Sequence, residues 1–167
     1  TDGAVNMWAF RLGKEYWLEI PGGMSRYHLI SEEAFVVSIC HELGHLLGGE
    51  PMNEEISFEG QSDYFASQDC AQLLLDKIKP YKKVIGDSEV KPTCEGSSLC
   101  DRILMGAKSL TSYYAELEKA PIPKISTPSS IKVDKTLTRH PPSQCRLDTL
   151  VAGYFKQMRP GCWYVEK

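Results

Sequence analysis

Two histidines four residues apart, His41 and His45, flank Glu42 in the segment SICHELGHLLGG. On a helix, residues four apart project from the same face, so both imidazole rings can reach one cation. A neutral imidazole pair suits Zn²⁺, and a catalytic zinc site has three protein ligands with a water in the fourth position. Glu42, beside the metal but not bound to it, would act as the general base toward that water. The spacing predicts a zinc centre that carries out hydrolysis.

The third zinc ligand must come from outside this helix. In the metzincin pattern it is a histidine six residues after His45, but that position is Pro51, which has no donor atom, so that subclass fails. Glutamates at positions 50, 54, 55 and 59 compete instead, and we expect the first two to be solvated loop charges. Glu59 is the best candidate because Asp63, one helical turn later, can orient a metal-binding imidazole.

Three separated segments resemble one family of metallopeptidases. HELGH and EGQSDYFAS resemble the H-E-x-x-H and E-x-x-A-D-x-x-A pair of the gluzincins that include the HtpX-like and CAAX prenyl proteases. TRHPPSQCR resembles their third segment, with His140 six residues before Arg146. The resemblance implies a mainly helical, zincin-like metallopeptidase domain that holds Zn²⁺ through His41, His45 and Glu59. It also implies that His140 stabilises the oxyanion, and that Arg146 holds that loop or Glu59 in place.

The chain departs from this family pattern in several places. Only 13 residues separate His45 from Glu59, Ser62 stands where the family has alanine, and an arginine intervenes between the threonine and the histidine of the third segment. These differences fit a minimal soluble form of the family. The ImmA-like regulator proteases also have a short gap, but their second motif usually ends in Ala-Asn, which Ser62-Asp63 does not match.

Capping residues predict the helix that must position the two histidines. Ser31 precedes two glutamates, whose charge is favourable in a first helical turn, and Gly48-Gly49 marks the end of the helix. Further helices are expected at about 58–78, 97–117 and 143–155. The helix at 97–117 carries an apolar stripe expected in the core: Leu99, Ile103, Leu110 and Leu117.

The remaining segments have their own signatures. Residues 6–20 alternate apolar and polar character on either side of Leu12-Gly13-Lys14, which predicts an antiparallel hairpin. Residues 15–20 are the candidate strand for aligning an extended peptide or protein substrate. Residues 119–143 contain five prolines and no periodicity, so we expect a long loop. The fold class is therefore α+β, mainly helical, with a small N-terminal antiparallel sheet.

Composition limits the possible partners. The 167 residues, 42% of them hydrophobic, fit one soluble domain spanning 1–167. The 19 basic and 22 acidic residues form no basic stripe, so we expect neither a nucleic-acid nor a membrane-surface partner. The longest apolar stretch, AFVVSIC, is far shorter than the roughly 20 residues that span a bilayer.

Six cysteines without a C-x-x-C pair favour disulfides over a cysteine zinc site, and hence an oxidising compartment. Cys145 with Cys162 is the preferred pair. The chain opens with Thr1 rather than methionine, which indicates a processed or trimmed N-terminus with room for an export signal upstream. Together with the cysteines, this predicts a secreted protein or one of the bacterial periplasm or cell envelope. The sequence predicts a zinc-dependent endopeptidase. Two alternatives stay open: a non-catalytic, zinc-stabilised secreted binding domain, and a disulfide-stapled interaction module without metal.

Overall fold

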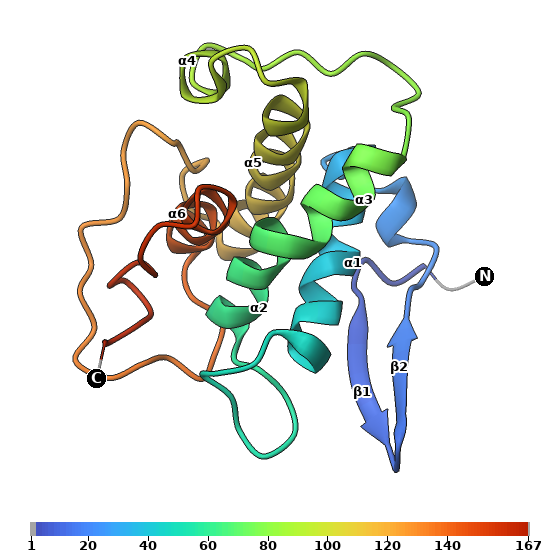
Figure 1. Cartoon of the computed structure of the whole chain (residues 1–167), viewed down its shortest axis with the longest axis vertical. Coiled ribbons are helices and arrows are strands. Elements are labelled where there is room, and N and C mark those ends of the chain that lie inside the picture. The colour runs from blue at the N-terminus through green and yellow to red at the C-terminus, as the bar shows by residue number, and fades with distance from the viewer. Residues whose placement is uncertain (1–2, 167) are drawn as a thin grey trace.

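Four helices form a closed circuit in the computed structural model, which describes residues 3–166 (Figure 1). They are α1 (Glu32–Leu47), α2 (Glu59–Phe65), α5 (Ser98–Glu118) and α6 (Ser143–Tyr154). Helix α1 packs against α2 and α5, and α6 packs against the same two helices on the other side. The fold is α+β and mainly helical, as expected, and the centre of the circuit receives side chains from all four helices.

Helix α1 has the predicted boundaries. The Ser31 hydroxyl accepts a hydrogen bond from the backbone N–H of Ala34 at 3.1 Å, which satisfies one of the free donors of the first turn. The helix ends at Leu47, and the backbone N–H of Gly48 donates to the Gly44 carbonyl. Gly49 then turns the chain away with a φ of +73°, a conformation that favours glycine.

The helix expected at 58–78 is present but interrupted. Helix α2 continues into a π turn, η2 (Ala66–Cys70), and then into α3 (Ala71–Lys77). A π turn inserts one extra residue into a helix, so it rotates the side chains that follow. The disulfide Cys40–Cys70 joins this turn to α1.

Two glycines allow the helices that meet α2 to approach closely. A Cβ atom on Gly44 of α1 would lie 2.7 Å from the Ser62 Cα atom of α2. A Cβ atom on Gly153 of α6 would lie 2.5 Å from the Tyr64 carbonyl oxygen, also of α2. Any larger residue at either position would therefore push α2 away from its neighbour.

Helix α5 matches the prediction for 97–117, with Ser97 as its cap. Ile103 and Leu110 of its apolar stripe are buried, but Leu117 is 62% exposed. The expectation for Leu117 was wrong: it lies in the last turn of α5, and its side chain faces solvent there. The short helix α4 (Val90–Cys94) was not predicted. The disulfide Cys94–Cys100 joins its last residue to α5. Five residues are too few to display a helical period.

The predicted hairpin consists of β1 (Trp8–Leu12) and β2 (Glu15–Glu19), paired antiparallel with Phe10 opposite Trp17. Strand β1 lies beside α1, and β2 lies on the outer side (Figure 1). The Arg11 side chain fastens the hairpin to α1 by donating to the Leu46 carbonyl at 3.0 Å. The strand next to the histidine-bearing helix is therefore β1, while residues 15–20, the candidate for aligning a substrate, contain the outer strand.

Residues 119–142 form no helix or strand and run along the outside of the helices (orange in Figure 1), so the expected long loop ends one residue earlier, where α6 begins. The C-terminal tail holds them: the backbone N–H of Leu137 donates to the Trp163 carbonyl at 2.8 Å, and Val133 donates to Gly161 at 2.9 Å. The predicted disulfide Cys145–Cys162 fastens this tail to α6. Trp163 is completely buried beside it.

The structure contains three disulfides, consistent with an extracellular protein. Within residues 3–166, every helix is too short or too polar to cross a membrane.

Candidate metal centre

The three predicted zinc ligands lie together. One ligand atom from each of His41, His45 and Glu59 falls within 4.8 Å of the other two. His41 Nε2 is 3.3 Å from Glu59 Oε2, and His45 Nε2 is 3.7 Å from Glu59 Oε1. Helix α1 supplies both rings from one face, and α2 supplies the carboxylate from its first turn. The close packing at Gly44 is what brings these two helices within reach of a single ion.

Hydrogen bonds on the far side of each ring determine which nitrogen faces the centre. His45 Nδ1 lies 2.8 Å from the Ser57 carbonyl oxygen, which only accepts, so Nδ1 carries the hydrogen. Ser62 Oγ lies 3.0 Å from the same nitrogen. His41 Nδ1 lies 2.8 Å from Asp63 Oδ1 and donates to it in the same way. When both rings are neutral, as metal binding requires, their Nε2 atoms direct a lone pair toward the space beside Glu59.

The centre thus gathers acceptors that lack a donor. Glu59 Oε2 is buried and, among the described residues, accepts no hydrogen bond. A buried carboxylate oxygen without a donor is costly unless a cation lies next to it. Two imidazole nitrogens and one carboxylate are a donor set that Zn²⁺ binds, and these residues therefore fit a zinc ion.

The pKa values of the metal-free chain also favour a positive charge at this centre. Burial alone would lower the pKa of His41, but the Asp63 carboxylate outweighs burial and raises this pKa to about 10. Burial would raise the pKa of Glu59, but its contact with His41 prevails and lowers this pKa to about 2. Without metal, a second proton on His41 supplies the positive charge that the centre requires. A metal ion would displace that proton.

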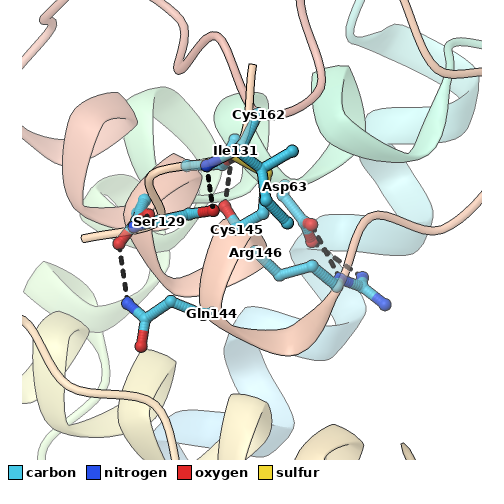
Figure 2. Close-up of a disulfide and its surroundings, with 9 residues drawn as sticks. Asp63, Ser129, Ile131, Gln144, Cys145, Arg146 and Cys162 are labelled. Carbon is cyan, nitrogen blue, oxygen red and sulfur yellow. Dashed lines mark hydrogen bonds and ion pairs between the residues drawn. A yellow bond between two sulfur atoms is a disulfide. The ribbon is translucent and has the colours of Figure 1, made fainter. Parts of the chain in front are cut away.

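Asp63 is held by Arg146 of α6. The guanidinium donates from Nε to Asp63 Oδ2 and from Nη2 to Oδ1, both at 2.8 Å (Figure 2). Its carbon lies 3.9 Å from the centroid of the Tyr114 ring. Although burial would raise the pKa of Asp63, the guanidinium keeps it well below its usual range. Arg146 was expected to hold the His140 loop or Glu59. Its hydrogen bonds run to Asp63 instead, and its Nη2 atom also lies 3.3 Å from His41 Nδ1, so it acts on the centre by positioning His41.

Glu42 and His140 also lie at the centre. Glu42 is half-buried, and burial, with a further contribution from the nearby Glu59 charge, raises the pKa of its carboxyl group. The His140 side chain is 70% exposed, but its Nε2 atom reaches within 3.2 Å of Glu59 Oε1. The long loop therefore brings His140 to the centre from the solvent side. The competing carboxylates Glu50, Glu54 and Glu55 are exposed.

Three contributors were missed from the sequence: Ser57, Ser62 and Tyr114. Ser62 could have been found, because it follows Glu59 by three residues and so shares its helix face. Ser57 acts through its backbone carbonyl, which carries no sequence signal. Tyr114 lies 32 positions before Arg146 and meets it only because α5 packs against α6.

No family model matches the chain, and neither does any curated protein or solved structure. The gluzincin resemblance therefore stays a prediction that depends on three short segments, and the site has to be judged on its own geometry.

Proposed function

We propose that this protein is a zinc-dependent endopeptidase with a zincin-like fold, in which His41, His45 and Glu59 bind the metal. The proposal depends mainly on one observation: two imidazole nitrogens, each oriented by a hydrogen bond on its far side, converge on the Glu59 carboxylate, whose buried Oε2 atom accepts no hydrogen bond among the described residues. Such orientation of metal-binding histidines by carbonyl and carboxylate partners is a general property of zinc sites.

Zinc bound at this centre would supply Lewis acidity, which lowers the pKa of water and polarises a carbonyl group. Glu42 would accept the proton of the attacking water and pass it to the leaving amine. Its raised pKa supports this role, because a general base works best when its pKa approaches the working pH. A zinc site that serves stability alone has no need for this glutamate and normally has four protein ligands.

His140 would stabilise the developing negative charge on the carbonyl oxygen, as the family resemblance implies. Two features of the side chain support this role: it contacts Glu59, and it remains largely open to solvent. Arg146 would be a positioning residue that keeps Asp63 charged and His41 correctly turned.

The substrate would be a peptide in extended conformation, aligned by main-chain hydrogen bonds along the strand beside α1. That strand is β1 in this fold. Three disulfides favour an oxidising location, either outside the cell or in a periplasm or cell envelope.

The test is hydrolysis of a mixed peptide library by wild type and by Glu42→Gln, with zinc measured in both proteins after dialysis. We expect one equivalent of zinc in each protein, and a loss of cleavage of at least a hundredfold in the variant. Glu55→Gln is the matched control, since it makes the same change at an exposed glutamate. Equal cleavage by Glu42→Gln would exclude the proposed mechanism. Zinc binding without any cleavage would favour the non-catalytic binding domain.

A further inference from the structure

A cavity of about 840 Å³ lies between the loop after α1, the long loop and the C-terminal tail. Its walls include Pro51 and Met52 on one side and Tyr164 and Val165 on the other. Phe58, the residue before Glu59, forms part of the lining. Thr138 is also part of it, two residues before His140, whose ring contacts Glu59. Two residues of the cavity wall are thus one and two positions along the chain from residues of the candidate metal centre.

The walls of this cavity are held in place by hydrogen bonds. The backbone N–H of Phe58 donates to the Pro51 carbonyl at 3.0 Å, which closes the loop after α1. The backbone N–H of Val165 donates to Thr136 Oγ1 at 3.1 Å, which ties the tail to the long loop.

Arg159 connects the two sides of the cavity. Its Nε donates to Gln61 Oε1 at 2.7 Å, and its Nη2 donates to the Glu50 carbonyl at 3.3 Å. Its guanidinium carbon also lies 5.2 Å from the centroid of the Tyr164 ring. The tail is thereby fastened to the loop after α1, so the cavity exists before any ligand enters it.

The chemistry of the lining is apolar and electrically balanced. Proline, methionine, phenylalanine, tyrosine and valine side chains provide the apolar surface. Two acidic residues, Glu50 and Asp134, are matched by two basic residues, Lys135 and Arg159. A charged ligand group would lose its hydration on entering the cavity, and lining charges of both signs would not compensate for that cost. Burial of a large uncharged side chain would be favourable, because it removes apolar surface from water.

We propose that this cavity is a specificity pocket that accepts a large apolar side chain, aromatic or long aliphatic, of a peptide lying at the metal centre. The inference rests on the proposed peptidase function for its biological meaning, and Met52 and Val165 are its specificity-determining residues. The peptide would be cut next to, or within a residue or two of, the side chain that fills the pocket.

The experiment measures binding separately from cleavage. Zinc-treated Glu42→Gln protein is titrated with blocked hexapeptides of alanine and glycine that carry Phe, Leu, Asp or Lys in turn at each position. We expect the Phe and Leu peptides to bind about tenfold or more tightly than the Asp and Lys peptides, at one preferred position. Met52→Trp, made in the same background, should fill the pocket and abolish this preference.

Met158→Trp is the matched control, because Met158 is 83% exposed and lies outside this cavity. Val165→Trp fills the pocket from the opposite wall and keeps the test valid if Met52→Trp fails to fold. Three results would contradict the proposed specificity pocket: equal binding of all peptides, no binding at all, or a preference that stays unchanged in both Met52→Trp and Val165→Trp.

Wild-type cleavage of the same peptides separates the two proposals. Selective binding without cleavage contradicts the peptidase function but supports the pocket. Cleavage that is indifferent to large apolar residues supports the function and contradicts the pocket.

Discussion

Arg146 donates two hydrogen bonds of 2.8 Å to Asp63, and both side chains are almost completely buried. The pair joins α6 to α2, and the Asp63 carboxylate that it neutralises also accepts from His41 Nδ1. A buried charge is tolerated only when it is paired, so Asp63 can orient His41 only while Arg146 is present.

Replacing Arg146 should therefore destabilise the fold and disturb the centre together. Arg146→Met removes the guanidinium that pairs with the buried Asp63 carboxylate, and we expect the free energy of unfolding to fall by about 3–5 kcal/mol in urea denaturation. Adding Asp63→Asn to this variant removes the poorly compensated charge and should recover part of the loss. If Arg146→Met costs under about 1 kcal/mol, the pair does not hold this site together.

Substituting a ligand should remove the metal. We expect His41→Ala, His45→Ala and Glu59→Gln each to weaken zinc binding at least a hundredfold, measured by competition with a chromophoric chelator. Because zinc binding stabilises only the folded chain, the same variants should lose the increase in melting temperature that zinc gives to wild type. Glu54→Gln, an exposed carboxylate in the same region, is the control and should bind zinc normally.

The metal-free protein should have a distinctive pH dependence. The folded-state pKa of His41 is raised from 6.5 to about 10, so the stability that its charge adds to the fold is complete below pH 6.5 and is lost as the pH rises toward 10. The folded-state pKa of Glu59 is lowered from 4.5 to about 2, so the stability that its charge adds is complete above pH 4.5 and is lost as the pH falls toward 2.

Chemical denaturation in the presence of a chelator should therefore show maximal stability from these two groups between pH 4.5 and 6.5. His41→Gln should flatten the alkaline side of the curve. An alkaline decline of unchanged size in that variant would mean that another group is responsible.

His140 discriminates between a catalytic and a closed, structural zinc site. In the catalytic case, His140→Ala should keep zinc affinity within about threefold of wild type while kcat/KM falls about 10²–10³-fold, the usual cost of removing an oxyanion donor. Arg139→Ala, at the neighbouring exposed position, controls for changes in the loop. A loss of zinc as large as that in His45→Ala would identify His140 as a fourth ligand and support the non-catalytic domain.

Gly44 tests the packing that brings the ligands together. A methyl group there would lie 2.7 Å from the Ser62 Cα atom, so Gly44→Ala should cost about 1–3 kcal/mol of stability and weaken zinc binding by displacing α2. Gly3→Ala is the control, because an added methyl group there has nothing within 4 Å. Normal zinc affinity in Gly44→Ala would show that α2 has room to adjust.

The parts of the fold that depend on local chemistry were predictable. Ser31 and Ser97 act as caps and locate two helices, and Gly13 identifies the hairpin turn. The ligand set followed from helix periodicity, since His41 and His45 are four apart and Glu59 and Asp63 are also four apart.

The parts of the fold that depend on contacts between segments far apart in the sequence were not predictable. The Arg146 to Asp63 contact joins positions 83 residues apart, and it forms because α6 crosses α2 where Gly153 leaves room. The π turn was also not predicted, because a single inserted residue leaves no local sequence signal. The wall formed by Val165 exists only because the tail is bonded to the long loop. Such contacts are selected by the assembled core rather than by any local preference.

The disulfide Cys40–Cys70 has a consequence for the order of events during biosynthesis. Cys40 directly precedes His41, and Cys70 follows shortly after the helix that carries Glu59, so the covalent bond spans the whole ligand-bearing segment. While its thiols are reduced, a newly made chain lacks this tether, and its ligands are dispersed over a larger volume. We therefore expect tight metal capture to follow thiol oxidation, which would keep the proposed hydrolytic centre inactive in the compartment where the protein is synthesised.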